Sequence, residues 1–241
     1  MPQERWRKAQ EAELAAWRRQ STWHHALLHS ALNALGIRKT KAGDDWNQWW
    51  YDQFDGYRVL PDQFQNAIEL GCGPYTNIRL IRRGRFIGSV VCSDPLALHY
   101  LRLARGWLET EHARGTIVLD AHPIEECTFP DGSFDLVVLI NVLDHVRDAM
   151  ACLDVVTRIA KPDGFLILGQ DLSDKDDAAR VGEDVAHPIR IHHGDLDTRL
   201  LGSFTPLFQK ILPREKGRNP EAHYGTYLLI GRKTGSVEPG S

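Results

Sequence analysis

The sequence predicts an α/β fold built on a mostly parallel sheet, with helices ahead of it and an antiparallel strand pair at its end. Three observations lead to this prediction. The first 60 residues show only helical spacing of apolar side chains, and an apolar run at 66–70 then ends in a glycine turn. From there to residue 169, short apolar runs alternate with amphipathic segments. Such alternation is typical of strands joined by helical crossovers, which implies a parallel sheet.

Composition narrows the class of protein. The chain has 241 residues, enough for one such domain with additions, and its 42% apolar and 25% charged residues are ordinary for a soluble globular protein. A net charge of -3 offers no basic surface for nucleic acid, and no apolar run reaches the length of a transmembrane helix. The start lacks the apolar core of a signal peptide, and the four cysteines form no C-x-x-C pair. We therefore expect reduced thiols and a cytoplasmic protein.

The N-terminal 60 residues are expected to form a helical cover. Helices are predicted over 1–20, 21–35 and 46–54, and six of the seven tryptophans lie in the first 50 residues. A row of aromatic side chains at helical spacing either packs on the core or covers a ligand, and a cover that packs on the sheet does both. In the third helix one face carries Trp46, Trp49, Trp50 and Phe54.

The main domain is predicted over residues 61–232, followed by a disordered tail at 233–241. An acidic segment at 171–186 is expected to be a loop or short helix that can act as a flap. The predicted strands are 66–70, 86–92, 116–119, 134–140 and 165–169, with an antiparallel pair at 205–212 and 224–232. The predicted helices are 76–83, 96–113, 147–160 and 195–201.

The turn after the first strand indicates what kind of ligand binds there. Gly71 and Gly73 let the backbone turn tightly and approach a ligand. The dinucleotide fingerprint needs a third glycine, but Thr76 stands in its place. Glu69 beside the turn would repel a pyrophosphate and attract an ammonium group. The pattern therefore favours a cationic ligand over NAD.

The run 69–74, Glu-Leu-Gly-Cys-Gly-Pro, resembles the first motif (E/D-x-G-x-G) of class I S-adenosylmethionine (SAM)-dependent methyltransferases. Over about residues 60–170 the chain is most similar to the small-molecule group known as methyltransferase type 11. The resemblance implies a Rossmann-like sheet of seven strands, SAM as cofactor and a small-molecule acceptor as partner. It implies no nucleic-acid or membrane partner and leaves a homodimer open.

Residues after successive strands are expected to bind the cofactor, because the carboxyl ends of parallel strands meet at one crevice. Asp94, 25 positions after Glu69, can accept hydrogen bonds from both ribose hydroxyls. It also suits an N-cap before Pro95, and NAD enzymes use an acid in the same way, so both alternatives stay open. The resemblance implies adenine contacts for Asp120 and methionine-side contacts for Asn141. The full expected set is Glu69, Gly71, Cys72, Gly73, Asp94, Pro95, Asp120, Ala121, Asn141 and Val142.

Candidate catalytic residues follow the fourth strand and the acidic segment. His145 is placed to act as a base toward a hydroxyl acceptor, with Asp144 beside it, although a structural role for this histidine is equally open. His192 is the further catalytic candidate, in a region that the resemblance places over the active site. Substrate contacts are expected from Tyr51, Arg190 and His193, with Arg190 suited to a phosphate or carboxylate.

No metal site is expected from the sequence. His192 or His193 with Asp195 has the look of a ligand cluster, but most such clusters are solvated loops and methyl transfer needs no metal. The leading hypothesis is therefore a SAM-dependent methyltransferase that acts on a small molecule at oxygen. The main alternative is a catalytically inactive methyltransferase-like binding or regulatory protein. A nicotinamide-dependent oxidoreductase is disfavoured by the missing glycine and the lack of a Tyr-x-x-x-Lys pair.

Overall fold

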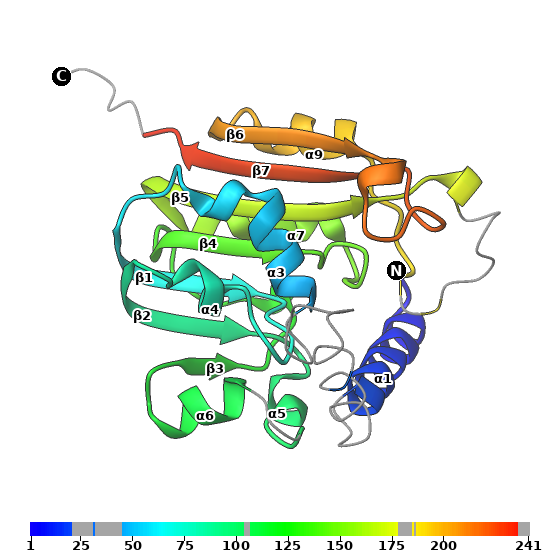
Figure 1. Ribbon diagram of the computed structural model, residues 1–241, viewed down its shortest axis with the longest axis horizontal. Helices are drawn as coiled ribbons and strands as arrows, with labels where there is room; N and C mark the ends of the chain where they lie inside the picture. The colour runs from blue at the N-terminus through cyan, green and yellow to red at the C-terminus, as the bar shows by residue number, and fades with distance from the viewer. Residues whose placement is uncertain (21–30, 32–44, 104–106, 178–184, 186, 236–241) are drawn as a thin grey trace.

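A computed structural model describes residues 1–20, 31, 45–103, 107–177, 185 and 187–235. The strands are β1 (Gln63–Leu70), β2 (Phe86–Ser93), β3 (Val118–Asp120), β4 (Phe134–Ile140), β5 (Ala160–Leu172), β6 (Phe204–Pro213) and β7 (Gly225–Lys233). They form one seven-stranded sheet in the order β3-β2-β1-β4-β5-β7-β6 (Figure 1). The first five strands pair in parallel, and β7 runs antiparallel to both β5 and β6. The expected mostly parallel sheet with an antiparallel end is confirmed.

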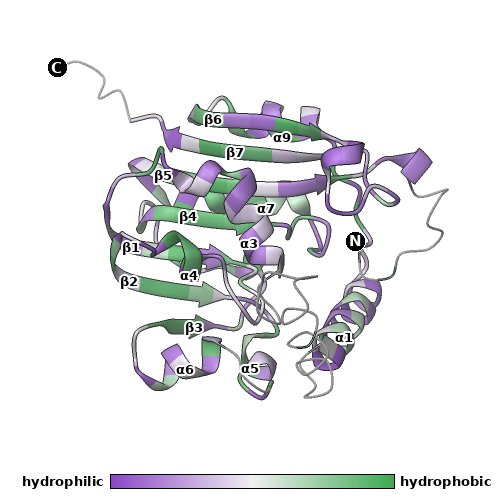
Figure 2. Cartoon of the chain, in the orientation of Figure 1, coloured by the Kyte–Doolittle hydropathy of each residue, from purple (hydrophilic) through white to green (hydrophobic). Residues whose placement is uncertain are grey.

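Helices cover both faces of this sheet. They are α1 (Gln3–Gln20), α3 (Asp45–Gln53), α4 (Ile78–Ile81), α5 (Ala97–Tyr100), α6 (Trp107–Ala113), α7 (Ala149–Ile159) and α9 (His193–Leu200). Short 3-10 turns lie at Asp55–Tyr57, Ile124–Glu126 and Arg214–Lys216. One hydrophobic core lies under α7 and α9, and a second lies under α3, α4, α5 and α6. Side chains alternate between the two along β1, where Ala67 faces the second core and Ile68 the first. The apolar colouring of β4 and of the middle of β7 in Figure 2 reflects this burial on both faces.

The strand predictions are confirmed with small shifts in their ends, and β5 differs most. It begins at Ala160 because Phe134 pairs with Ala160 before the register shifts and Leu136 pairs with Phe165. The predicted turn at 161–164 is the irregular stretch between these pairs, where Asp163 has a φ of 63°. The turn is thus present, but it lies within a strand rather than before one.

The helices were predicted less well. The single helix expected over 96–113 is two short helices, α5 and α6, and the chain turns after Tyr100. The helix expected over 76–83 is reduced to the single turn of α4. The helix predicted over 21–35 lies almost wholly outside the described residues. So do residues 178–184 and 186 of the acidic segment and 236–241 of the tail.

Helix α3 belongs to the core of the sheet. Trp50 and Phe54 are only 2% and 1% exposed, and a Cβ added to Gly169 of β5 would lie 2.7 Å from Trp50 Cζ3. The aromatic face of this segment was expected either to pack on the core or to cover a ligand. Trp50 and Phe54 pack on the core. The domain boundary near residue 60 stays a prediction, since the second core contains side chains from both sides of it. In the described part of the chain, no helix combines the length and apolar character needed to cross a bilayer.

Truncation of Phe54, the residue that directly follows α3, tests whether the C-terminal end of this helix packs in the core. Phe54→Ala should lower the free energy of unfolding by about 3–5 kcal/mol, because a fully buried ring leaves a cavity. Phe86→Ala is the matched control, since Phe86 is 59% exposed and should change stability by about 0.5 kcal/mol or less. Urea denaturation measures both, and equal losses would contradict the assignment of α3 to the core.

Candidate active site

The carboxylate of Glu69 lies beneath the glycine turn, where it binds the start of α4. It accepts hydrogen bonds from the backbone N–H of Asn77 (2.8 Å) and Ile78 (3.0 Å) and from Asn77 Nδ2 (2.9 Å). These backbone donors have no partner within a helix that begins here. Burial raises the pKa of Glu69, and the same hydrogen bonds lower it. Both oxygens of Glu69 are thus directed to α4, and the expected contact of Glu69 with a cationic ligand stays a prediction.

The glycine turn is held against the end of β2. The N–H groups of Gly71 and Cys72 both donate to the carbonyl oxygen of Ser93, at 2.7 and 3.1 Å. Gly71 has a φ of +67°, and a Cβ there would lie 2.4 Å from Val142 Cγ2. Gly73 has a φ of +56° but meets nothing within 4 Å. The first glycine is thus needed for packing, and the second leaves open space for a ligand.

Asp94 connects this turn to the segment after β2. Its Oδ2 accepts from Gly73 N at 3.1 Å and its Oδ1 from Leu96 N at 2.8 Å. The carboxylate therefore caps the following turn, as one alternative expected, and also borders the cavity. Burial raises the pKa of Asp94 to about 6 against the lowering effect of these two bonds, with Glu13 raising it further and His145 lowering it.

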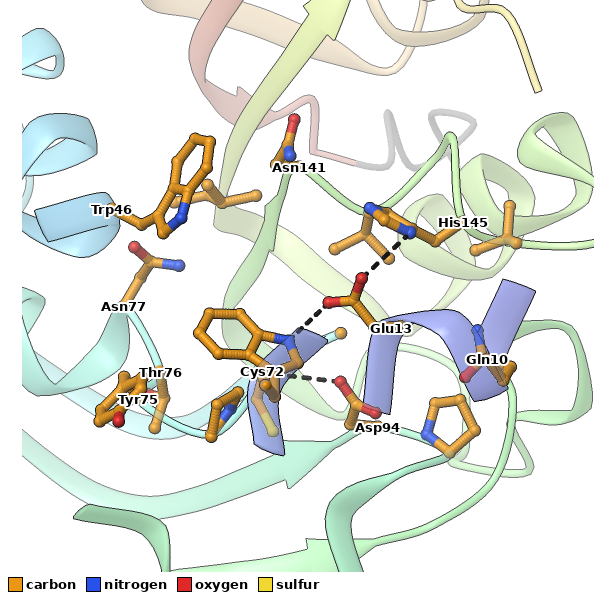
Figure 3. Close-up of a pocket in the computed structure, with 18 of the residues that line it drawn as sticks. Gln10, Glu13, Trp46, Cys72, Tyr75, Thr76, Asn77, Asp94, Asn141 and His145 are labelled. Carbon is orange, nitrogen blue, oxygen red and sulfur yellow. Dashed lines mark hydrogen bonds and ion pairs between the residues drawn. The ribbon is translucent and has the colours of Figure 1, made fainter. Parts of the chain in front are cut away.

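A cavity of about 340 Å³ opens at the carboxyl ends of β1, β2 and β4 (Figure 3). This volume is within the range of roughly 300–1,000 Å³ for small-molecule sites. The glycine turn, Asp94 and Asn141 form one side, and α1 and α3 supply Trp6, Trp17 and Trp46 to the other. The N-terminal helices thus cover the cavity as well as packing on the sheet.

The cavity wall is acidic. It contains four acids, Glu13, Asp94, Glu125 and Asp171, and three histidines, His145, His187 and His223, and among the described residues no lysine or arginine lines it. A low-dielectric cleft with one sign of charge favours a ligand of the opposite sign. The thiol of Cys72 adds no negative charge, because burial raises its pKa well above the usual value.

Glu13 of α1 is a cavity residue that the sequence did not single out. Its Oε1 accepts from Trp17 Nε1 at 2.5 Å, and its Oε2 lies 3.9 Å from His145 Nδ1 (Figure 3). Helix α1 has many charged residues, and nothing in its sequence distinguishes Glu13 as the one that lines the cavity. Only the docking of α1 over the cavity reveals it.

Behind the cavity wall, Asp144 forms the centre of a polar cluster. It is 2% exposed, accepts from Gln170 Nε2 at 3.0 Å, and lies 3.8 Å from His145 Nε2. Burial acts to raise the pKa of Asp144, but His145, His187 and Gln170 together hold it below the usual value. The ring of His187 lies 4.5 Å from that of His145. His223, whose ring lies close to that of His187, is a further member that no sequence pattern indicated.

Asn141 has a left-handed backbone at the end of β4, with a φ of 57°. Asparagine tolerates this conformation better than most residues, and such strain gathers at functional sites. Its N–H donates to Gly169 O at 2.7 Å, and its Oδ1 accepts from Asp171 N at 3.2 Å. The bend turns the chain so that Val142 closes on the glycine turn.

The structure brings most of the expected cofactor residues together. Seven of the ten border the cavity: Gly71, Cys72, Gly73, Asp94, Pro95, Asn141 and Val142. Glu69 lies beneath the turn. Asp120 and Ala121 are adjacent but, in the described structure, do not line the cavity. Asp120 accepts from Ser93 Oγ at 2.8 Å, and its carbonyl oxygen accepts from Asp94 N at 2.9 Å.

The catalytic and substrate candidates divide in the same way. His145 lines the cavity with Asp144 behind it, whereas Tyr51, Arg190, His192 and His193 are not among the described residues that line it. Tyr51 packs edge-on against Tyr57, 5.6 Å between ring centroids. His193 begins α9, and its N–H donates to Tyr224 Oη at 3.1 Å. The side chains of Tyr51, His192 and His193 thus contact other aromatic residues.

The middle of the chain is similar to known methyltransferases. Residues 68–168 match the Methyltransf_11 family model, described as a methyltransferase domain. Thiol S-methyltransferase TMT1B of Rattus norvegicus is 29% identical over 129 residues, which cover 53% of this chain and 52% of that protein. The chain therefore matches only about half the length of this relative.

Solved structures share the fold at low sequence identity. The N-methyltransferase NodS from Bradyrhizobium japonicum WM9, in complex with S-adenosylhomocysteine (SAH), superposes with a TM-score of 0.58 and 17% identity over 85% of this chain and 97% of that one. The [4+2]-cyclase SpnF superposes with a TM-score of 0.57 and 14% identity over 81% and 82%. At these identities the likeness establishes the fold.

The two glycines of the turn make a matched pair for mutation. Gly71→Ala and Gly73→Ala each place an alanine at positive φ, at a cost of about 1–2 kcal/mol. Gly71→Ala should lose roughly 1–3 kcal/mol more, because its Cβ overlaps Val142. Denaturant midpoints measure the difference. Equal destabilisation of the two variants would contradict the packing role given to Gly71.

Proposed function

This chain carries a class I SAM-dependent methyltransferase domain, and from that premise we propose that the protein transfers the methyl group of SAM to a small-molecule acceptor. The main support is the cavity at the carboxyl ends of β1, β2 and β4, whose described wall holds acids and histidines and no lysine or arginine. SAM carries a sulfonium and an ammonium group and suits such a wall. A nicotinamide dinucleotide carries a pyrophosphate and does not.

Within the proposal, each cofactor part has an assigned contact. Asp94 holds the ribose hydroxyls, since its carboxylate borders the cavity. Asp120 and Ala121 meet the adenine from the adjacent strand end, and Asn141 and Val142 lie beside the methionine and the methyl group. The part of Glu69 is indirect, because its bonds to α4 fix the turn that carries Gly71 and Gly73.

The acceptor is proposed to react through oxygen. Asp144 and His145 are the polar groups that follow Asn141 and Val142, so they are suited to hold and activate a hydroxyl beside the methyl group. The sulfonium is already activated, so holding donor and acceptor in line and excluding water supply most of the catalysis. The similarity to TMT1B, named as a thiol S-methyltransferase, makes a thiol the next acceptor to test. Tyr51, Arg190, His192 and His193 are assigned no role in the reaction.

A binding protein without methyltransferase activity is the second candidate. SpnF, named as a cyclase, shares the fold, and a fold by itself does not determine a reaction. The methyltransferase hypothesis is favoured because Gly71, Gly73 and Asp94 all border the cavity. Turnover of SAM separates the two candidates.

Calorimetric titration with SAH and with NADH tests the cofactor class. We expect micromolar binding of SAH and none of NADH. Labelled SAM with phenol, thiophenol and aniline as matched acceptors then tests the reacting atom, with labelling of phenol expected. SAH binding without transfer to any acceptor in a wider screen would favour the binding protein, and binding of NADH alone would overturn the proposal.

Asp94 should make SAH binding depend on pH. Its pKa is raised to about 6, so the ionised acceptor of the ribose hydroxyls is lost as the pH falls below that value. Affinity for SAH should therefore fall between pH 7.5 and 5. Asp94→Asn should weaken binding by about tenfold or more at pH 7.5, as expected for hydrogen bonds to a charged group. The variant should also show a flatter pH profile.

Stability should change in the opposite direction. In the absence of ligand, a carboxyl whose pKa is raised by folding binds protons more readily in the native state, so it stabilises the fold at pH 4 and loses this contribution as the pH rises to 6. In Asp94→Asn this decrease in the free energy of unfolding between pH 4 and 6 should be absent. Asp62→Asn, at an exposed aspartate, is the control. Wild-type affinity and pH profile in Asp94→Asn would take this residue out of the cofactor site.

A further inference from the structure

Three residues from two distant segments meet at one end of the cavity. One ligand atom each from Asp144, His145 and His187 lies within 4.8 Å of the others. Asp144 and His145 follow β4, and His187 precedes the segment that leads into α9. No spacing in the sequence joins them, and the metal-like cluster that the sequence does contain, around His192 and Asp195, lies in a different place.

The charge around this cluster is unbalanced. Asp144 and Asp171 are both buried, and Gln170 Nε2 donates to Asp144 Oδ1 (3.0 Å) and to the Asp171 carbonyl oxygen (3.1 Å). Glu13 faces the same group from α1. A buried carboxylate needs a partner of opposite charge, and no described lysine or arginine lines this wall.

The positions of the histidine ring nitrogens in this cluster resemble those of metal-binding histidines. His145 Nε2 faces Asp144 at 3.8 Å, and its Nδ1 faces Glu13 at 3.9 Å. A metal-binding histidine usually directs its second nitrogen toward a carboxylate in this manner. Within the described residues, the buried Nδ1 atoms of His145 and His223 have no hydrogen-bond partner. Gln170 fixes the orientation of the Asp144 carboxylate.

We propose that Asp144, His145 and His187 bind a divalent transition-metal ion of the zinc type at the acceptor end of the cavity. Two imidazoles and one carboxylate match the ligands such ions select, and three protein ligands leave a position open for a substrate atom. Bonds of about 2.0–2.2 Å bring ligand atoms within roughly 4 Å of one another, so side-chain shifts of less than about 1 Å close the site. The proposal rests on the proposed function for its chemistry but not for its binding.

The ion gives the acceptor site its chemistry. A hydroxyl or thiol bound in the open position has its pKa lowered by the ion, and its proton leaves to water. The resulting oxyanion or thiolate attacks the methyl carbon of SAM. A new carbon–oxygen or carbon–sulfur bond forms as the methyl–sulfonium bond breaks, and its electron pair stays on sulfur to give SAH. A bare hydrogen-bonded cluster, in which the same residues only exchange protons, is the competing arrangement.

Metal binding can be measured without turnover. The purified protein, treated with EDTA and desalted, is titrated with Zn²⁺, with Co²⁺ followed by its visible absorption, and with Mg²⁺ as an oxygen-preferring control. We expect one equivalent of Zn²⁺ or Co²⁺ to bind at micromolar or lower concentration, with little binding of Mg²⁺. His187→Ala should weaken binding tenfold or more, and His112→Ala, at an exposed histidine of α6, should not.

Asp144→Asn provides a second variant that keeps the size of the side chain while removing its charge, in case a truncation disturbs folding. Circular dichroism confirms that each variant is folded. No stoichiometric binding of Zn²⁺ or Co²⁺, or equal binding by the His187 and His112 variants, would overturn the metal site.

SAH affinity is measured on the same samples. If SAH binds and methyl transfer proceeds at full rate after EDTA treatment, the metal proposal fails while the proposed function stands. If SAH does not bind, the proposed function fails whatever the metal result.

Discussion

The buried carboxylate of Glu69 is the interaction on which the site depends. Glu69 lies one residue before the end of β1 and accepts hydrogen bonds from the first free N–H groups of α4. The strand, the glycine turn and the helix are therefore held together over a few residues. The cost of burying an acid is offset by three hydrogen bonds from Asn77 and Ile78. With this anchor in place, Gly71 packs under Val142 and Gly73 faces open space.

Electrostatics then gives the cavity its character. The sheet brings the residues after β2, β4 and β5 to one edge, and α1 adds Glu13 from the opposite side. A wall of acids and histidines is costly to bury and is matched by a cationic ligand or a bound cation. Both proposals for this protein follow from that imbalance. SAM supplies positive charge at the cofactor end, and a metal ion supplies it beside Asp144.

The strands and the cofactor half of the site were largely predictable. Strand segments such as β4 are apolar apart from Asp135, and the polar residues directly after them must reach the ligand edge of a parallel sheet. Helices were harder, because the segment 96–113 has helical spacing throughout but turns after Tyr100. The hydrogen bonds of Glu69 to α4 could not be predicted, since a strand-end acid can turn toward the ligand or toward the next helix. No pattern in the surrounding sequence marks Glu13 or His223 as a residue of the cavity.

The sequence by itself determined the order of strands and helices, the glycine turn and the polar residues at each strand end. These follow from local patterning of apolar and polar side chains, which any fold of this class must respect. The tertiary structure alone decided which side chains meet. His187 joins Asp144 and His145, and Glu13 faces His145, through contacts between segments far apart in the chain. Such contacts depend on packing geometry, which leaves no period or spacing in the sequence.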